Sequence, residues 1–451
     1  MMGKQVVAPQ LFYDFCIDDH VPDDHLLRRV DRFVDLESVR TELKPFYSMI
    51  GRPSIDPDLM LRMLIVGYCM GIRSERRLCD EVHLNLAYRW FCGLGLNGSV
   101  PDHSTFSRNR HGRFRESNIL RRLFESVVEL CLREGLIGGD GFAVDASLIA
   151  ADANKHRSLP SSEWNAADIG PDACRAAREY LATLDDAAFG AASESIPKFV
   201  SPSDPAAQWT GALKGHAFFA YATNYLIDLD HAIILDVEAT RAIRQAEVGA
   251  ARTMIDRVEK RFGLHPEKLA ADRAYGSAEM LGWLVHERGI EPHIPVFDKS
   301  ARNDGTFERE DFTYDRESDV YFCPAGKKLT CKGTLVNDGA TLMYRASKFD
   351  CDPCTLKPRC SPNAPARKIP RSIHEGARNM ARNIAKTDAF LTSRRERKKI
   401  EMLLAHLKRI LQLDRLRLRG PNGARDEFHL AATAQNLRKL AKLRSPAMAI
   451  A

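Results

Sequence analysis

Three acidic residues of this sequence stand where carboxylates could bind metal ions. Glu401 lies in SRRERKKIEMLLAHLKRIL, a strongly basic stretch over residues 393–411. Asp145 lies in the middle of a glycine-punctuated apolar run of strand length, and Asp272 follows another short apolar run. Aspartate is depleted in strand interiors, so Asp145 needs a partner or a metal. Hard divalent cations prefer such oxygen ligands, and a carboxylate flanked by cations suits a metal site that acts on phosphate.

The spacing within residues 393–411 predicts a single helix with Ser393 as its N-cap. Its apolar stripe comprises Ile400, Leu403, Leu404, Leu407 and Leu411. At roughly 100° per residue, a second stripe beside it comprises Arg394, Arg397, Glu401 and Lys408. Glu401 should therefore border the core. The alternative is a solvated Arg397–Glu401 ion pair, worth only roughly 0.2–0.5 kcal/mol.

Composition indicates a globular chain with a basic surface. The chain has 451 residues, of which 44% are hydrophobic and 28% charged, so it can form two to four domains. The net charge of +6 favours a polyanionic partner, and the basic residues concentrate in 62–115 and 367–442. No apolar run reaches the roughly 18 residues of a membrane helix. The N-terminus has no secretory hydrophobic region, so we expect a cytoplasmic protein without a membrane partner.

Residues 1–135 are expected to be wholly helical. Asp56 and Pro57 begin a helix that runs to about Gly71, and shorter helices follow at 74–83 and 86–94. The last helix of the group, capped near Ser104, carries Arg108 and Arg110. This succession predicts a helix-turn-helix-like DNA-binding domain. A plain helical bundle with solvated arginines is the competing interpretation.

After residue 135 the pattern changes to strands alternating with helices. Strands are expected around Asp145, at 216–230 and 232–240, before Asp272 and at 290–296, with helices at 246–262 and 278–288. This order predicts a mixed α/β sheet flanked by helices, in which the first strand can lie beside the fourth. Asp145 would then lie near Asp272. The competing interpretation of Asp272 is a helix cap before AYGSAEM.

Five of the eleven cysteines crowd into residues 323–360. One C-x2-C pair with further cysteines near by indicates a zinc-ribbon-like module that uses Cys323, Cys351, Cys354 and Cys360. Reduced, unliganded thiols are the alternative. The other six cysteines stand in apolar or helical contexts and are expected to be reduced.

Several of these segments resemble the DDE transposases of bacterial insertion sequences, which have a ribonuclease H-like core. The N-terminal FYSMIGRPSIDPDLMLRMLIVGYCMGIRSERRLCDEV and PDHSTFSRNR look like the helical N-terminal domain of one large branch. VDASLIAADANKHRS and ADRAYGS look like the surroundings of the first and second catalytic aspartates of that branch. The glutamate signature of the broader group, Tyr-x2-Arg-x3-Glu-x6-Lys, matches at Arg397, Glu401 and Lys408. Arg394 stands where that signature has tyrosine, which puts an aromatic contact to a terminal base in doubt.

The resemblance implies a transposase that binds element ends and catalyses Mg²⁺-dependent DNA cleavage and strand transfer. Asp145, Asp272 and Glu401 would hold two Mg²⁺ or Mn²⁺ ions, with Asp145 bridging both. Arg397 and Lys408 would position phosphates. Further candidate DNA contacts are Arg394, Arg415, Arg417, Arg108 and Arg110. A homodimer on double-stranded DNA, associated with the nucleoid, is expected.

The implied domains are a helical domain over 1–135, a ribonuclease H-like domain over 136–299 plus 371–445, and a cysteine-rich insertion over 300–370. A helical and loop insertion over 155–212 interrupts the second. Two other functions stay open, namely a non-catalytic DNA-binding repressor or decayed relative, and a nuclease of the same fold. An intact acidic triad favours the transposase over a decayed relative.

Overall fold

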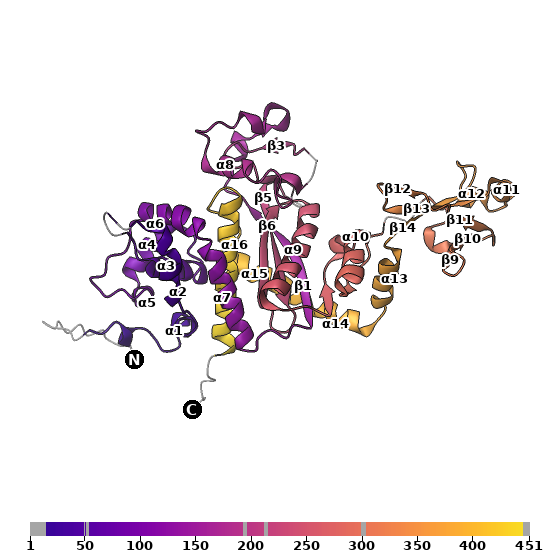
Figure 1. The fold of residues 1–451 in the computed structure, drawn as a ribbon. Helices are drawn as coiled ribbons and strands as arrows, with labels where there is room; N and C mark the ends of the chain where they lie inside the picture. Colours follow the sequence, from indigo (N-terminus) through magenta and orange to yellow (C-terminus); the bar gives the residue numbers. More distant parts are fainter. Residues whose placement is uncertain are drawn as a thin grey trace, which may run out of the picture. The chain divides into compact units, whose positions relative to one another are not determined.

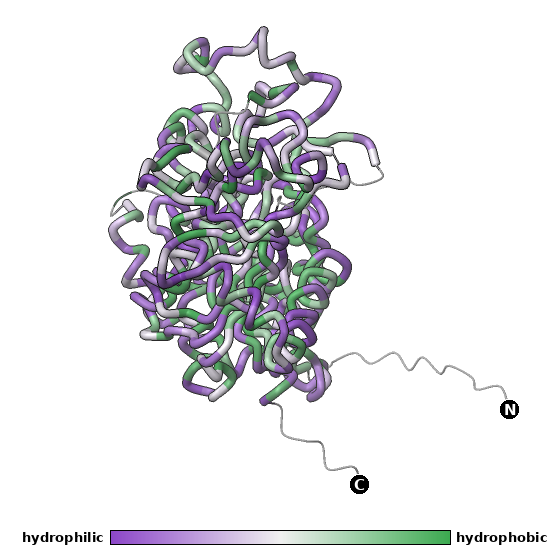
Figure 2. The backbone as a smooth tube through the Cα atoms, turned by 90° about the vertical axis from the view of Figure 1, so that its right-hand side faces the viewer, coloured by the Kyte–Doolittle hydropathy of each residue, from purple (hydrophilic) through white to green (hydrophobic). Residues whose placement is uncertain are grey.

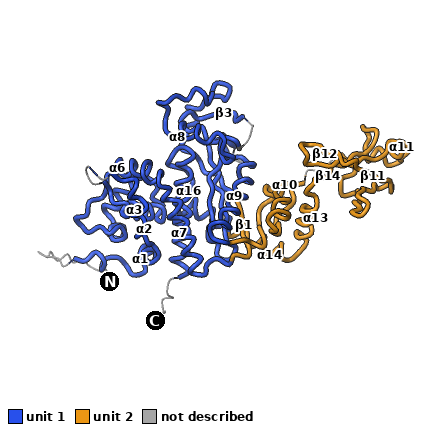
Figure 3. Tube along the Cα trace, viewed as in Figure 1, with its two compact units in different colours: residues 1–138, 146–263, 400–451 blue, residues 139–145, 264–399 orange. Residues whose placement is uncertain are grey.

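The computed structural model describes residues 15–48, 50, 54–192, 196–211, 215–298 and 304–444. The chain forms two compact units (Figure 3). Unit 1 comprises residues 1–138, 146–263 and 400–451, and unit 2 comprises residues 139–145 and 264–399. The N-terminal helices thus share unit 1 with later segments. The predicted domain boundaries at residues 135 and 299 stay predictions.

The described part of the N-terminal region is helical, as predicted (Figure 1). Asp56 caps α3 by accepting a hydrogen bond from the Asp58 amide, and Pro57 is the first helical residue. The last predicted helix is capped by Asp102, two residues before the expected position. The helices are α1 (Leu26–Asp31), α2 (Glu37–Leu43), α3 (Pro57–Cys69), α4 (Glu75–Leu84), α5 (Leu86–Phe91), α6 (His103–Asn109) and α7 (Ile119–Arg133).

A mixed sheet follows, and the strand β1 (Gly141–Ala150) contributes to both units. In unit 1, β5 (Phe218–Asp228) pairs antiparallel with β6 (Ile234–Arg241) and with β4 (Gln208–Thr210). In unit 2, the first residues of β1 pair in parallel with β7 (Lys268–Ala270), which pairs in parallel with β8 (Glu291–His293). The mixed α/β fold and the pairing of the first with the fourth predicted strand are confirmed.

The connections agree with the predicted order. The helices are α9 (Arg244–Phe262) and α10 (Ala278–Gly282), and α10 continues as a π-helical turn over Trp283–Arg288. In the insertion over residues 155–212, the helical part includes α8 (Arg175–Leu181), and β2 (Leu159–Pro160) pairs with β3 (Phe199–Val200). The end of the insertion also supplies β4 to the sheet, which the sequence did not predict.

The helix α16 (Pro421–Leu443) is the central helix of unit 1. The sequence predicted only its basic end, residues 436–443. Most of α16 is buried against α3, α7 and β6. Asn436 is fully buried, and its side-chain amide accepts from the Ile234 amide (2.9 Å) and donates to the Ile234 carbonyl (2.8 Å). The basic residues near its C-terminal end suggested an exposed helix, so the sequence did not indicate that α16 is a core helix.

The cysteine-rich segment of unit 2 folds into a sheet of its own. Its strands are β9 (Thr313–Asp315), β10 (Val320–Phe322), β11 (Lys328–Thr330), β12 (Leu335–Val336), β13 (Thr341–Ala346) and β14 (Lys368–Ser372). They are antiparallel in the order β12-β13-β11-β10-β9, with β14 beside β13. The buried core comprises Phe312, Tyr321, Leu329, Tyr344 and Ile369. Two short helices, α11 (Lys348–Cys351) and α12 (Lys357–Cys360), each end in a cysteine, and Cys354 lies between them.

The predicted single helix over residues 393–411 is wrong. Thr387 accepts from the Phe390 amide and caps α14 (Asp388–Glu396), and a turn at Arg397 separates it from α15 (Lys398–Arg409). Ser393 is therefore not an N-cap but a buried residue inside α14. The segment starts earlier because Thr387 supplies the capping oxygen. The apolar stripe is confirmed, since Ile400, Leu403, Leu407 and Leu411 are buried.

Hydrophobic and hydrophilic residues interleave along the backbone (Figure 2). Within the described ranges, no helix has both the length and the apolar character needed to span a bilayer.

Candidate active site

Asp145 lies in β1, and Asp272 lies two residues after the end of β7, the parallel neighbour of β1 in unit 2. The register pairs Ala143 of β1 with Ala270 of β7, and each aspartate follows two residues later. Adjacent strands lie about 4.8 Å apart, so this register brings two carboxylates to one place at the end of β7. The strand pairing on which the predicted proximity depends is present, although 127 residues separate the two aspartates in sequence.

Asp145 is half-buried and lies next to a cation. The residues before it in β1, from Phe142 to Val144, are buried, whereas the Asp145 side chain is 19% exposed. Arg397 Nη1 lies 3.4 Å from Asp145 Oδ2. The guanidinium partly compensates a carboxylate that the strand places near the core. Arg397 thus contacts the site by a pair that the sequence did not predict.

Asp272 caps a short turn. Its Oδ1 accepts a hydrogen bond from the Ala274 amide at 2.7 Å and caps the 3-10 turn Arg273–Tyr275. The alternative interpretation of Asp272 as a cap is therefore borne out. A cap bond of this kind uses one carboxylate oxygen and orients the group, so it is compatible with cation binding through the other.

Glu401 lies in the first turn of α15, in unit 1, and is exposed. An acidic residue in the first turn is favoured by the helix dipole. Lys408, two turns later, donates from Nζ to the Leu148 carbonyl at 3.0 Å. Burial lowers the pKa of Lys408, and its bond attaches α15 to the end of β1. Within unit 1, Lys408 thus binds the main chain of β1, which differs from the predicted contact with a phosphate.

The predicted DNA-contacting arginines differ in exposure. Arg108, Arg394 and Arg417 are exposed. Arg110 is buried, pairs with Glu75 at 3.1 Å and donates to the Tyr68 hydroxyl, so we no longer propose it as a DNA contact.

Arg415 and Arg419 both pair with Asp152, at 2.9 Å and 3.0 Å. Asp152 follows β1 and appeared in the sequence only as an edge residue. The pairing results from a parallel bridge between Ala150 and Arg415, which lays residues 414–416 along the end of β1. Such a long-range bridge leaves no signal in the sequence.

The cysteine-rich segment brings its predicted zinc ligands into one neighbourhood. Burial first, and then the charges of Cys351, Cys323 and Cys354, raise the pKa of Cys360. The Lys327 amide donates to Cys323 Sγ at 3.3 Å. The cysteines of this segment are half-buried free thiols. In the described part of the chain, however, no three His, Cys, Asp or Glu side chains are arranged to hold a metal ion.

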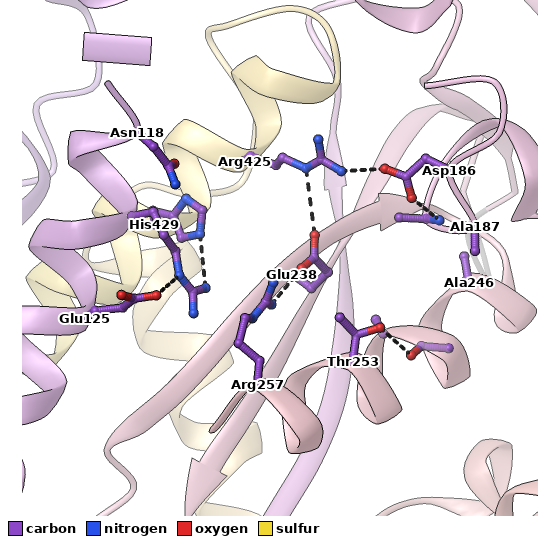
Figure 4. Close-up of a pocket in the computed structure, with 14 residues that line it drawn as sticks. Asn118, Glu125, Asp186, Ala187, Glu238, Ala246, Thr253, Arg257, Arg425 and His429 are labelled. Atoms are coloured by element: carbon purple, nitrogen blue, oxygen red, sulfur yellow. Dashed lines mark hydrogen bonds and ion pairs between the residues drawn. The ribbon is translucent and has the colours of Figure 1, made fainter. Parts of the chain in front are cut away.

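A separate cavity of about 550 Å³ in unit 1 is lined by charged residues (Figure 4). Arg425 pairs there with Asp186 (2.7 Å), Arg257 with Glu238 (2.7 Å) and Arg121 with Glu125 (2.6 Å). Because each guanidinium has a carboxylate partner, we assign no ligand to this cavity. It contains none of the predicted site residues.

Two family matches cover separate parts of the chain. Residues 15–112 match the Transposase domain (DUF772), and residues 322–441 match the Transposase DDE domain. The second match includes the cysteine-rich sheet from the end of β10 onward and Glu401, but not Asp145 or Asp272. No curated protein matches the chain.

A helical N-terminal region, a mixed α/β sheet and the two matches support a transposase class of protein. The matches support a DDE transposase of an insertion-sequence family, which confirms the predicted resemblance.

Proposed function

We propose that this protein cleaves DNA at the ends of its own insertion sequence and joins those ends to new DNA, using divalent metal ions held by Asp145, Asp272 and Glu401. The observation that supports the proposal is the parallel pairing of β1 with β7, because Asp145 and Asp272 each come two residues after the paired Ala143 and Ala270. Such a pair can share one hard cation, and the third acid would complete the set.

The three acids fit Mg²⁺ or Mn²⁺ by chemistry, because all are oxygen donors. Two bound ions would supply an activated oxygen nucleophile and charge neutralisation on the leaving oxygen. Asp145, nearest the core, would bind both ions, while Asp272 and Glu401 would each bind one. Arg397 lies against Asp145 and is positioned to contact a phosphate that approaches this carboxylate.

Cleavage and joining are tested with labelled duplex that carries the inverted repeats flanking the gene. We expect Mg²⁺-dependent nicking at the repeat ends and, with target DNA present, joined products. Cleavage without joining would identify a nuclease, and binding without cleavage would identify a repressor. A homodimer on DNA and a cytoplasmic, nucleoid-associated location complete the proposal.

Arg397→Gln is expected to lower the cleavage rate about 10- to 100-fold, because a charged hydrogen bond to phosphate is worth about 1.5–3 kcal/mol. The Mg²⁺ concentration that gives half-maximal cleavage should stay the same or fall, since a cation beside Asp145 has been removed. Arg395→Gln, at an exposed position two residues earlier, is the matched control. A rise in the required Mg²⁺ with an unchanged maximal rate would contradict a phosphate-positioning role.

We also propose that Cys323, Cys351, Cys354 and Cys360 bind one structural Zn²⁺, supported by their shared neighbourhood. Metal analysis of protein purified without chelator should then find about one zinc per chain. Cys351→Ser should lose the zinc and lower the melting temperature, whereas Cys174→Ser, at an exposed cysteine in the other unit, should do neither. If the parent protein contains no zinc and has the same melting temperature as Cys351→Ser, these thiols are unliganded.

A further inference from the structure

A second cavity of unit 1, of about 370 Å³, has a different character from the charged cavity of Figure 4. It lies among α1, α15 and α16, and four of its lining residues are cations. Among the described residues that line it, none is acidic. The lining comprises Leu26, Arg29, His406, Gln435, Arg438, Lys439 and Lys442. Its lining is therefore strongly electropositive.

The helix α16 supplies most of the charge from one face. Gln435, Arg438, Lys439 and Lys442 follow one another at i, i+3, i+4 and i+7, which is one side of a helix. Much of the rest of α16 is core. The basic residues of 436–443, which the sequence already showed, thus line a single cavity.

Two of the cations are held in place without losing their charge. Arg438 Nη1 donates to the Cys69 carbonyl at 2.7 Å, and Lys439 Nζ donates to the His231 carbonyl at 2.5 Å. Carbonyl oxygens orient these two groups, and no described residue of the lining is acidic.

Three buried polar atoms of the lining, Arg29 Nε, His406 Nδ1 and Gln435 Oε1, have no hydrogen-bond partner, although the side chains of His406 and Gln435 also interact with each other. Gln435 is only 5% exposed. Buried polar groups ordinarily have partners, so such a group calls for a ligand or water. The amide of Gln435 and the ring of His406 can each present a donor, depending on amide orientation and tautomer.

We infer that this cavity binds a phosphate group of the DNA backbone. The inference rests on the proposed function for the choice of DNA over a free phosphate. His406 lies five residues after Glu401 on α15, about 7.5 Å along the helix axis. A phosphate held here would fix DNA beside the helix that carries the third proposed metal ligand.

The test is binding of end-containing duplex without added Mg²⁺ and without chelator, so that no cleavage takes place and the proposed zinc is kept, over a range of salt concentrations. The variant is Arg29→Gln/Lys442→Gln, which spares the two cations that hold backbone carbonyls. The control is Arg133→Gln/Lys260→Gln, which removes the same charge from exposed positions. Arg133 lines a different cavity, together with Asp35, Glu37 and Glu129.

We expect the variant to bind about 10-fold more weakly than the control and its salt slope to fall by about 1. Equal affinity and slope in variant and control would overturn the inference while leaving the proposed function intact. Parent protein that does not bind the duplex at all would overturn the proposed function. Pyrophosphate that raises the melting temperature of the parent but not of the variant, with equal DNA binding, would identify a free phosphate ligand and overturn the DNA assignment.

Discussion

Asp145→Asn should reduce Mg²⁺-dependent cleavage of element-end DNA by at least about 10³-fold, which corresponds to about 4 kcal/mol of transition-state stabilisation. In the proposed site this carboxylate binds both metal ions, and a neutral amide binds a hard cation more weakly than a carboxylate does. Asp272→Asn should have a similar effect. Its capping bond to the Ala274 amide can be kept by the asparagine oxygen, so the turn should still form. Single-turnover cleavage of labelled DNA measures both losses.

Asp140→Asn is the matched control for these variants. Asp140 is exposed and directly precedes β1, and its main-chain carbonyl accepts from the Glu267 and Lys268 amides. Its substitution should leave cleavage within about twofold of the parent. Circular dichroism and melting temperature show whether each variant is folded. Folded Asp145→Asn that cleaves as fast as the parent would remove Asp145 from the site.

Glu375→Gln should lower the free energy of unfolding of unit 2 by about 3–5 kcal/mol, the usual cost of breaking a buried ion pair. The Glu375 side chain is only 1% exposed and lies at the start of α13 (Glu375–Ile384). Its carboxylate pairs with Arg309, with Arg378 at 2.9 Å and with Arg382 at 2.8 Å. A glutamine would leave three guanidinium groups facing a neutral amide. Urea unfolding at pH 7, followed by circular dichroism, measures the change.

The same carboxylate predicts an acid-sensitive stability. Burial acts to raise the pKa of Glu375, but hydrogen bonds from Arg309 and Arg382 and the nearby positive charges outweigh it and lower the pKa to about 2. The unfolded chain has its ordinary pKa of 4.5. Because the folded pKa is the lower one, the stabilisation is fully present above about pH 4.5 and is lost as the pH falls towards 2. The difference amounts to about 3 kcal/mol.

Glu375→Gln should therefore show a weaker loss of stability between pH 5 and pH 2 than the parent. Glu317→Gln removes an exposed acid of the same unit and should follow the parent at every pH. If Glu375→Gln and Glu317→Gln unfold at the same urea concentration at pH 7, the ion-pair network does not stabilise unit 2.

Local signals in the sequence predicted much of the fold. Asp56 and Pro57 begin a helix because a capping oxygen and a preset φ act within a few residues. The strands β5 and β6 and the helix α9 follow from apolar periodicity and from the turns between them. Where two candidate N-caps lie within a few residues of each other, the sequence predicted the start of the helix less reliably. Thr387 begins α14, although Ser393 fits the apolar pattern better.

The sequence by itself predicted the family, which the matches support, the basic end of α16, and the three acids and four cysteines of the proposed metal sites. Residue type and short-range spacing carry that information. Tertiary structure alone decided which of these groups meet. The parallel pairing of β1 with β7 relates the positions of Asp145 and Asp272, burial removes Arg110 from the candidate DNA contacts, and α1 and α15 contribute to a cavity with one face of α16. Those outcomes depend on pairings between separate segments of the chain, such as Arg110 with Glu75, 35 residues apart, and packing energy selects such pairings over the whole chain rather than within any one stretch.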